Sequence, residues 1–178
     1  MRIDPNKITL RTASAEDDDA ALTGLLNEAF PGFFEERSFF KQEPHQRVLA
    51  FQGPTLVGQI GIDRRVISIE GTPYRIIGLI DLCVTPKARR QGIGRALVQA
   101  AEALGQDREF AILFSDSPEI YRAWGYRPLP AAPMRWLAID ELRSHAVIEG
   151  EMSDVLLVKP LGTRKWPPGM IDLLGYMF

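Results

Sequence analysis

The amino-acid sequence predicts a mixed α/β (α+β) fold, and three patterns support that prediction. Runs that are apolar at every second or at every position indicate strands, apolar residues at helical spacing indicate helices, and turns rich in Gly and Pro separate them. The order along the chain is strand, helices, antiparallel meander, helix, strand, short helix and further strands. A chain of 178 residues is expected to form a single domain over residues 1–178.

The N-terminal part is expected to begin with a half-buried strand over residues 7–12, where polar and apolar residues alternate. A helix follows, with Ser14 as its N-cap and Asp17 completing a capping box, and it ends near Pro31-Gly32. The acidic run Asp17–Asp19 indicates helix capping and a solvated face rather than a metal site.

The stretch FPGFFEERSFF begins at Phe30 and is very aromatic for its length. It is either a second short helix whose rings pack on the core or a lid whose rings contact a ligand. Packing is the favoured interpretation, and the two are compatible. Phe30 and Phe33 are therefore candidates for contacting a substrate.

Three strands are expected next, over residues 46–52, 55–69 and 74–84, and the turn Glu70-Gly71-Thr72 joins the last two as a hairpin. The run YRIIGLIDLCV is apolar at both its odd and its even positions, which is typical of a strand buried on both faces.

Helical spacing then runs from Ile93 to Leu104, and Gly105 ends the helix. FAILF (residues 110–114) is a buried strand and PEIYRAW (118–124) a short helix with proline at its start. The remaining strand candidates are YRPLP, MRWLAI and DVLLVKPL.

Composition excludes several classes of function. A net charge of −2 argues against extensive nucleic-acid binding. Cys83 is the single cysteine, and neither His45 nor His145 has a companion at ligand spacing, so no metal is expected. The sequence has no apolar run of about 18 residues and no signal-peptide core, so a cytoplasmic protein without a membrane segment is expected.

The stretch TPKARRQGIGRAL, which begins at Thr85, carries the main chemical signal. It follows a buried strand and opens a helix, whose first N–H groups have no intrahelical partner and carry partial positive charge. Gly92 and Gly94 let an anion approach the backbone, and the nearby cations suit a polyphosphate. A dinucleotide fingerprint is excluded because Leu97 stands at its third glycine, and a Walker A loop is excluded because G-K-[ST] is absent.

R-x-x-G-x-G, which follows V-x-P in DLCVTPKARRQGIGRALV, resembles the acyl-CoA motif of the GNAT superfamily of N-acetyltransferases. The resemblance implies a GNAT-like mixed, mostly antiparallel central sheet of six to seven strands flanked by about four helices. It also implies acetyl-CoA (coenzyme A) as co-substrate, with its pyrophosphate on the backbone N–H groups of residues 90–95. The pantetheine arm would pair with the backbone around Val84. The implied coenzyme-binding residues are Leu82, Cys83, Val84, Arg89, Arg90, Gln91, Gly92, Ile93, Gly94 and Arg95.

Two residues are candidates for catalysis. Tyr121 precedes Gly125-Tyr126 in a pattern similar to the one that carries the general acid in GNAT enzymes, which protonates the leaving thiolate. Asp81 is the only ionisable side chain from Ile77 to Val84, so it is a base, an anchor for an ammonium group or a structural residue. A β-bulge on that strand would reverse the face on which Asp81 lies. A lone cysteine in an apolar strand, Cys83, is expected to be inert.

DVLLVKPLG followed by WPPGMIDLLG resembles the last part of the aminoglycoside 2'-N-acetyltransferases and the nodulation-type N-acyltransferases. In the aminoglycoside branch the chain end approaches the substrate, so the Phe178 carboxylate is a candidate contact for a cationic amine. The glutamate of that branch has no clear counterpart at Ile80 or Asp81, which weakens the case for an aminoglycoside substrate.

The resemblance therefore predicts an N-acetyltransferase that moves acetyl from acetyl-CoA to a primary amine of a small molecule by direct attack. The alternatives are a catalytically silent acyl-CoA-binding sensor or interaction module and a long-chain N-acyltransferase. The expected partner is the amine acceptor, not nucleic acid or a membrane, and a homodimer is left open.

Overall fold

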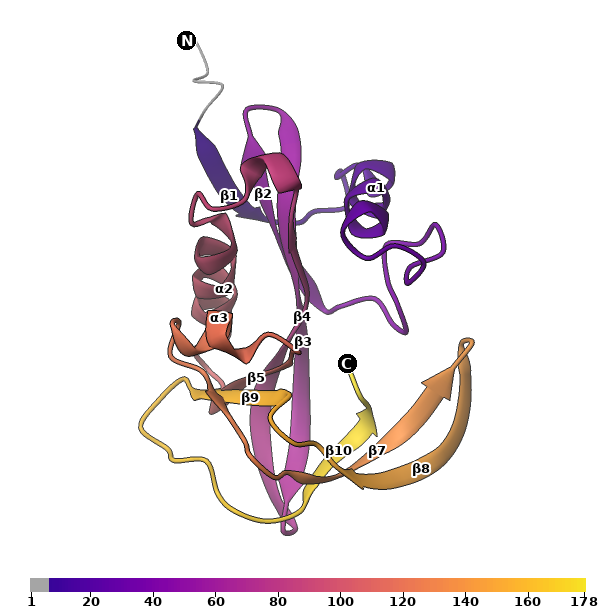
Figure 1. The fold of residues 1–178 in the computed structure, drawn as a ribbon, viewed down its shortest axis with the longest axis vertical. Helices are drawn as coiled ribbons and strands as arrows, with labels where there is room; N and C mark the ends of the chain where they lie inside the picture. Colours follow the sequence, from indigo (N-terminus) through magenta and orange to yellow (C-terminus); the bar gives the residue numbers. More distant parts are fainter. Residues whose placement is uncertain (1–6) are drawn as a thin grey trace. The chain divides into compact units, whose positions relative to one another are not determined.

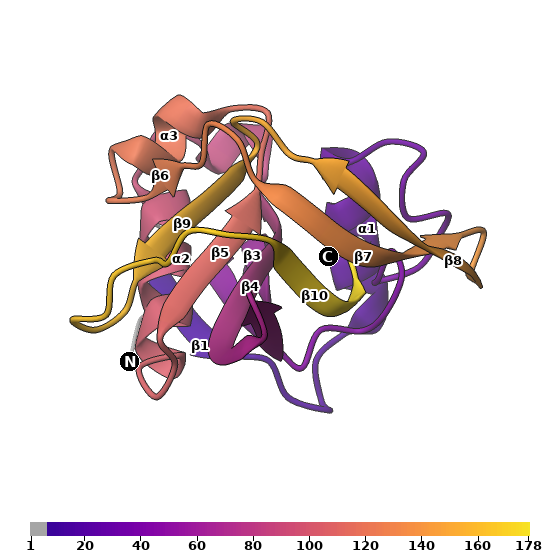
Figure 2. The same ribbon diagram turned by 90° about the horizontal axis from the view of Figure 1, so that it is seen from below.

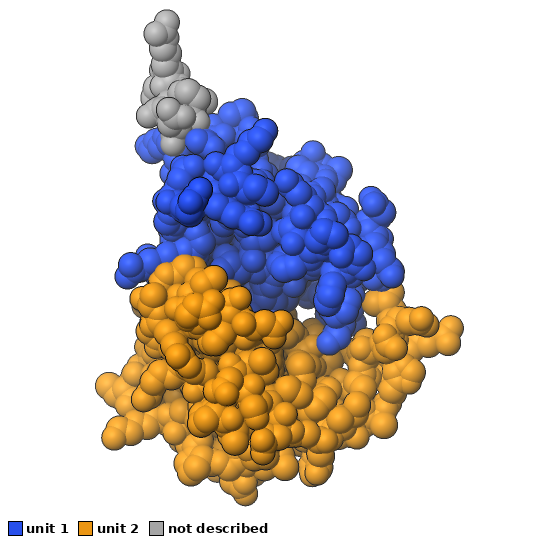
Figure 3. Space-filling view, viewed as in Figure 1, with its two compact units in different colours: residues 1–62, 79–103 blue, residues 63–78, 104–178 orange. Residues whose placement is uncertain are grey.

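The computed structural model describes residues 7–178, and the chain divides into two compact units (Figures 1 and 3). Unit 1 holds residues up to 62 together with 79–103, and unit 2 holds residues 63–78 and 104–178. Strands β3 (Thr55–Ile69) and β4 (Thr72–Val84) contribute residues to both units. The predicted mixed α/β class is confirmed. A single domain over the whole chain stays a prediction.

Unit 1 is a meander with a helix on each side. β2 (Gln46–Gln52) pairs antiparallel with β1 (Ile8–Thr12) and with β3, which lies next to β4. Figure 1 shows α1 (Asp19–Ala29) and α2 (Ile93–Leu104) on opposite sides of these strands.

The core under α1 follows from the apolar spacing of that helix. Its inward face meets the sheet because residues three and four apart lie on one side of a helix. The buried residues that pack there are Leu22, Leu25, Leu26, Phe34, Leu49 and Cys83. This packing fixes the start of α1 beside β2.

Unit 2 contains the strand order β6–β9–β5–β4–β3–β10–β7–β8 (Figure 2). The pairs β4–β5 and β10–β7 are parallel, and β5–β9, β6–β9, β7–β8 and β10–β3 are antiparallel. The elements not yet bounded are β5 (Phe110–Phe114), α3 (Pro118–Arg122), β6 (Arg127–Pro128), β7 (Pro133–Asp140), β8 (Arg143–Glu151), β9 (Leu156–Pro160) and β10 (Ile171–Tyr176).

The start of α1 differs from the sequence-based prediction. Its N-cap is Asp18, whose side chain accepts a hydrogen bond from the Ala20 N–H at 2.9 Å, instead of Ser14. Ser14 and Asp17 form a separate turn before the helix: the Asp17 carboxylate accepts from the Ser14 N–H at 2.7 Å and is also bound by Arg11. Because Asp17 is held there, the helix begins later.

The aromatic segment after Phe30 forms turns, so the second short helix, one of the two alternatives for this segment, is wrong. Glu35 and Glu36 have φ values of 48° and 65°, in the left-handed region that a right-handed helix cannot use. Phe34 is buried, whereas Phe33 is 57% exposed. The rings therefore divide between the core and the surface.

The strand count also differs from the prediction. Residues 7–178 form ten strands, three α-helices and one 3-10 turn, η1 (Pro86–Ala88), instead of six to seven strands and about four helices. β8 and β10 have no counterpart among the predicted strands. Within the same residues, no helix is long and apolar enough to cross a membrane.

Candidate functional site

The junction between β4 and α2 is the place where the sequence predicts an anion-binding loop. β4 ends at Val84 and α2 begins at Ile93. Gly92 has a φ of 78°, and an added Cβ there would meet no heavy atom within 4 Å. The Ala96 N–H donates to the Gly92 carbonyl at 3.0 Å. The N–H groups of the three residues between them therefore come before the first helical hydrogen bond and face out of the helix start.

Cationic side chains surround this open helix start. Arg90, whose φ is 61°, and Arg95 are exposed, and so is Gln91. Arg89 also anchors the loop, because its Nε donates to the Val84 carbonyl at 3.0 Å. The side chain of Ile93 is buried. The loop can therefore offer backbone donors, partial helix charge and exposed cations to one anion.

The last residues of β4 present one backbone edge away from β3. The Thr85 N–H donates to the Val57 carbonyl at 2.8 Å, so this N–H faces β3. Because backbone groups alternate along a strand, the N–H of Val84 faces the opposite edge. Leu82 and Val84 are half-buried, and Cys83 is buried.

The Cys83 thiol is not suited to carry an acyl group. Burial raises its pKa to about 12, so the thiol is neutral near neutral pH. Since the thiolate is the nucleophile, this supports the inert role expected from the sequence.

Asp81 lies at an irregularity in β4. It is half-buried, and its φ of 53° lies in the left-handed region, which interrupts the regular alternation of a strand. The Gln59 amide donates from its Nε2 to the Asp81 carbonyl. A side chain of β3 thus binds the backbone where the strand departs from regular geometry.

Arg47 of β2 extends this hydrogen-bonded set. Its Nη1 donates to Gln59 Oε1 at 2.9 Å, and its Nη2 donates to the Ser38 carbonyl. Arg47 is 8% exposed and Gln59 is fully buried. Burial lowers the pKa of Arg47, and the negative charges of Asp81, Asp19 and Glu43 act in the opposite direction. This set was not predicted from the sequence, although a polar residue inside each of two apolar strands was a visible signal.

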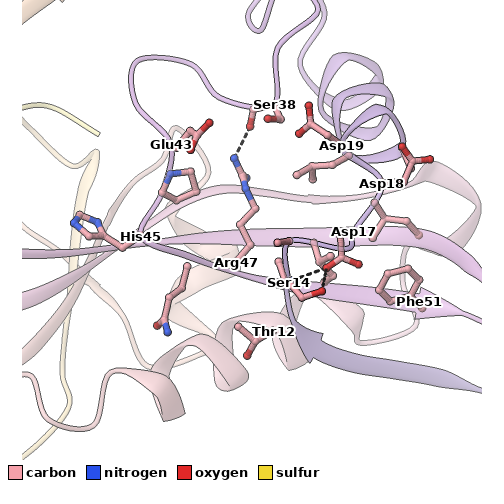
Figure 4. Close-up of a pocket in the computed structure, with 18 of the residues that line it drawn as sticks. Thr12, Ser14, Asp17, Asp18, Asp19, Ser38, Glu43, His45, Arg47 and Phe51 are labelled. Atoms are coloured by element: carbon pink, nitrogen blue, oxygen red, sulfur yellow. Dashed lines mark hydrogen bonds between the residues drawn. The ribbon is translucent and has the colours of Figure 1, made fainter.

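A cavity of about 750 Å³ in unit 1 opens above Arg47. Figure 4 shows the Arg47 side chain pointing from β2 toward Ser38, with Glu43 and Asp19 on the same side. Two other acidic groups of the lining already have partners, since Asp17 binds Arg11 and Asp18 caps α1. The further side chains labelled there are Thr12, Ser14, His45 and Phe51. In the described part of the chain, no three His, Cys, Asp or Glu side chains gather as a metal site.

Tyr121 lies on α3 in unit 2. Its ring contacts Trp124 and Tyr126 edge-on, with ring centroids 5.3 and 6.1 Å away. Burial raises the pKa of Tyr121, so its hydroxyl keeps its proton at neutral pH. Within residues 7–178 this hydroxyl makes no hydrogen bond, so the ring is fixed while its polar group stays available.

Phe30 and Phe178, which are candidates for contacting the amine substrate, have different surroundings. Phe30 is half-buried, with its ring 5.6 Å from that of Phe34. The Phe178 ring lies on Gly78, where an added Cβ would come within 2.5 Å of it, and 5.6 Å from the ring of Phe114. Phe178 therefore packs within unit 2 through its ring.

Unit 1 thus brings together the loop at residues 89–95, the end of β4 and Asp81, and also contains the half-buried Phe30 and the exposed Phe33. Tyr121 and Phe178 belong to unit 2. The roles predicted for these residues from the sequence stay predictions.

The fold and the loop together define a class of protein. In this class, one strand of a mixed sheet ends at a helix start that contains glycine and is rich in cations. The family described as "Acetyltransferase (GNAT) domain" matches residues 9–129, which include Asp81, the loop and Tyr121. The chain belongs to this family, and the predicted GNAT membership is confirmed.

Solved structures share this fold over most of the chain. A GNAT family N-acetyltransferase (YhbS) from Escherichia coli in complex with CoA has a TM-score of 0.68 at 16% identity, covering 94% of this chain and 90% of its own. A GNAT family acetyltransferase from Brucella melitensis in complex with acetyl-CoA has a TM-score of 0.63 at 16% identity, covering 93% and 95%. Arabidopsis thaliana NAA60 in complex with a bisubstrate analogue has a TM-score of 0.61 at 14% identity, covering 86% and 98%. The GNAT-like fold is thus confirmed, while the two branches named from the sequence stay predictions.

Proposed function

We propose that this protein is an N-acetyltransferase that transfers acetyl from acetyl-CoA to a primary amine of a small molecule. The observation that carries the proposal is the open start of α2, where backbone N–H groups and exposed arginines surround Gly92. Family membership and the CoA or acetyl-CoA present in two structures of the same fold support it.

In this proposal, the coenzyme pyrophosphate binds the backbone N–H groups of residues 90–95, with Arg90 and Arg95 adding charge. Leu82 and Val84 pair with the pantetheine arm through their backbone, and Cys83, whose backbone faces β3, lies between them. The residues fit such a ligand because Gly92 leaves space above the helix start and the Val84 N–H faces away from β3. That N–H would stabilise the oxyanion of the tetrahedral intermediate.

The proposed reaction is direct attack. Asp81, or a water that it orders, takes a proton from the ammonium of the acceptor, and the amine nitrogen bonds to the thioester carbonyl carbon. The carbon–sulfur bond then breaks, Tyr121 protonates the departing thiolate, and the nitrogen gives its second proton to the resulting phenolate, which leaves a neutral amide and restores Tyr121. Tyr121 meets one requirement of a general acid, because burial raises its pKa and its hydroxyl therefore carries a proton at neutral pH.

Arg47 and Gln59 act as positioning residues in this scheme. Gln59 holds the Asp81 carbonyl at the irregular point of β4, and Arg47 fixes the Gln59 amide with the orientation that makes its NH₂ the donor. Asp19 and Glu43 place negative charge beside the unit 1 cavity, which would attract a cationic amine.

The test measures thiol release from acetyl-CoA with a panel of aminoglycosides, polyamines, amino acids and peptides, and coenzyme binding by calorimetry. Binding together with turnover of at least one amine is the expected result. Coenzyme binding without turnover of any amine would favour the acyl-CoA sensor. Absence of coenzyme binding would reject the proposal.

Two variants locate the chemistry. Gly92→Val should weaken coenzyme binding at least ~10-fold, because valine is strained at a φ of 78° and its side chain would occupy the space for the anion. Gly71→Val is the matched control, since Gly71 has the same φ and open surroundings but lies in the β3–β4 turn.

Tyr121→Phe should lower kcat by roughly 10²-fold while leaving coenzyme binding unchanged, which is the size expected for loss of a general acid. Tyr126→Phe is the control ring, being buried beside Tyr121. An unchanged kcat in Tyr121→Phe would remove Tyr121 from the mechanism.

A further inference from the structure

Arg47 is a buried cation that has no carboxylate in contact with it. The residue is 8% exposed, and its two hydrogen bonds go to neutral oxygens, the Gln59 amide at 2.9 Å and the Ser38 carbonyl. In residues 7–178, no carboxylate forms a hydrogen bond or an ion pair with Arg47. Buried charges in proteins are usually paired, because a buried charge has lost its hydration. Arg47 therefore lacks the counter-ion that such burial normally requires.

The acidic side chains near Arg47 compensate its charge only in part. Burial lowers the pKa of Arg47, and the opposing charges of Asp81, Asp19 and Glu43 do not restore it. Asp19 and Glu43 are exposed, so solvent screens their effect on the buried guanidinium. An anion in direct contact with Arg47 would complete the compensation.

Arg47 still has hydrogen-bond donors for such an anion. A guanidinium carries five N–H groups, and the bonds to Gln59 and Ser38 occupy one on Nη1 and one on Nη2. The other three N–H groups are left for a ligand, and Arg47 lines the cavity of about 750 Å³ in unit 1. A carboxylate is the anion whose shape and charge suit a guanidinium.

The same cavity offers negative charge to an ammonium group. Figure 4 shows the side chains of Asp19 and Glu43 on the same side of β2 as the end of Arg47. These exposed acids repel a ligand that carries only negative charge. An amino acid is neutral overall, because it carries both a carboxylate and an ammonium. Its two charges therefore complement both the buried cation and the exposed acids.

Gln59 connects this cavity with the proposed base. Its amide accepts from Arg47 and donates to the Asp81 carbonyl, so a single carboxamide lies between the guanidinium and the backbone of Asp81. A ligand whose carboxylate binds Arg47 would thus hold an amine a few bonds away near Asp81.

We propose that Arg47 binds the carboxylate of the acceptor, so that the amine substrate is an amino acid whose nitrogen lies toward Asp81. The identity of this ligand as the acceptor rests on the proposed function. The binding of a carboxylate to Arg47 does not, and it can be measured without turnover.

The test measures by calorimetry the binding of N-acetyl-leucine and N-acetyl-leucinamide, with and without coenzyme A. The two ligands differ only in a carboxylate against a neutral amide, and the leucine side chain suits an apolar part of the lining, Leu22, Leu49 and Leu56. N-acetyl-leucine should bind at least ~10-fold more tightly, the size expected for a hydrogen bond to a charged group. Equal affinities, or binding of neither ligand, would overturn the proposal.

Two variants assign the preference to the guanidinium. Arg47→Met removes the charge and should make the affinities for the two ligands equal. Gln59→Leu is the matched control, because it breaks the same hydrogen-bonded set but keeps the guanidinium, and it should retain the preference. Circular dichroism checks the fold of each variant. A preference that persists in folded Arg47→Met would contradict the proposal, and the comparison of ligands on wild type decides the question where that variant does not fold.

Turnover separates this proposal from the proposed function. Leucine should exceed 3-methylbutylamine, the same amine without the carboxylate, at least ~10-fold in kcat/KM. Equal or faster turnover of 3-methylbutylamine would support the proposed function and overturn the role of Arg47. Preferential binding of N-acetyl-leucine without turnover of any amine would support the carboxylate site and reject the proposed function.

Discussion

Two buried polar side chains of β3, Gln59 and Asp63, stabilise the two units in different ways. In unit 1, the Gln59 amide accepts from Arg47 and donates to the Asp81 carbonyl. In unit 2, the Asp63 carboxylate accepts from the Tyr176 hydroxyl at 3.3 Å. They are four residues apart, and both are 1% exposed or less.

The Gln59 amide and the Asp63 carboxylate differ in the hydrogen-bond donors and acceptors that they offer. An amide has both a donor and an acceptor and can bridge two neighbours without gaining or losing a proton. A carboxylate only accepts, so its partner must bring a proton, and here that partner is a titratable phenol. We therefore expect the Gln59 contacts to be insensitive to pH and the Asp63 contact to be sensitive.

Gln59→Leu should have the largest effect on stability. The change leaves the buried guanidinium of Arg47 and the Asp81 carbonyl each without the Gln59 amide, and such losses cost about 3 kcal/mol in total. Urea unfolding followed by circular dichroism measures the loss. The loss of unfolding free energy caused by Gln59→Leu should be the same at pH 7 and at pH 10.

Gln46→Leu is the matched control. Gln46 is also a glutamine of a strand, but its Oε1 is buried with no hydrogen-bond partner among the described residues. Replacing it should be neutral or stabilising. Equal losses in the two variants would remove the distinction between a bridging amide and an unpaired one.

Tyr176→Phe should have an intermediate effect that depends on pH. Burial and the charge of Asp63 raise the pKa of Tyr176 to about 12. The folded state therefore holds this proton more tightly than the unfolded chain, whose tyrosine pKa is about 10. The contribution is present below pH ~10 and is lost as the pH rises toward 12.

The free energy of unfolding, measured between pH 8 and 11.5, tests this pH dependence. Wild type should lose stability across the upper part of the range, whereas the variant should lose less there and start about 1 kcal/mol lower at pH 8. Asp63→Asn keeps an acceptor and removes the charge, so it should lower the pKa of Tyr176 in the folded protein and make the alkaline loss of stability smaller, ending at a lower pH. Parallel profiles for wild type and Tyr176→Phe would contradict the assignment.

Asp17→Asn should have the smallest effect. Arg11 binds Asp17 and holds the pKa of that carboxyl well below its usual range, yet both side chains are in contact with solvent. Solvent screens such a pair, so we expect a smaller loss than in either buried variant. The loss should have its full size above the unfolded pKa of about 4 and should decrease as the pH falls from there toward the depressed pKa of the folded protein. A loss as large as that of Gln59→Leu would reverse the comparison.

The sequence predicted the buried elements well and the exposed ones poorly. The bounds of β3, α2 and β5 agree with the prediction to the residue, because each follows an apolar pattern. β8 has no buried residue and therefore no such pattern. The turn before it is a two-residue hairpin loop at Glu141-Leu142, where both residues have positive φ without the usual Asn or Gly.

The candidate site divides in the same way. The coenzyme loop was predictable because its glycine and arginine spacing is itself the chemical signal. The contacts of Asp81 were not, because they depend on a left-handed backbone at that residue and on Gln59 from another strand. Polar residues in buried strands indicate that a partner exists, but the register decides which one.

Burial of Cys83 makes the wild-type chain its own reporter of local opening. Cys83 is the only cysteine of the sequence and is 6% exposed, and its raised pKa suppresses the reactive thiolate. A thiol reagent should therefore modify the folded protein only when β4 detaches locally in unit 1, so that the labelling rate counts those events. A ligand that pairs with the backbone of Leu82 to Val84 would lower the labelling rate of Cys83. No cysteine has to be introduced to measure this.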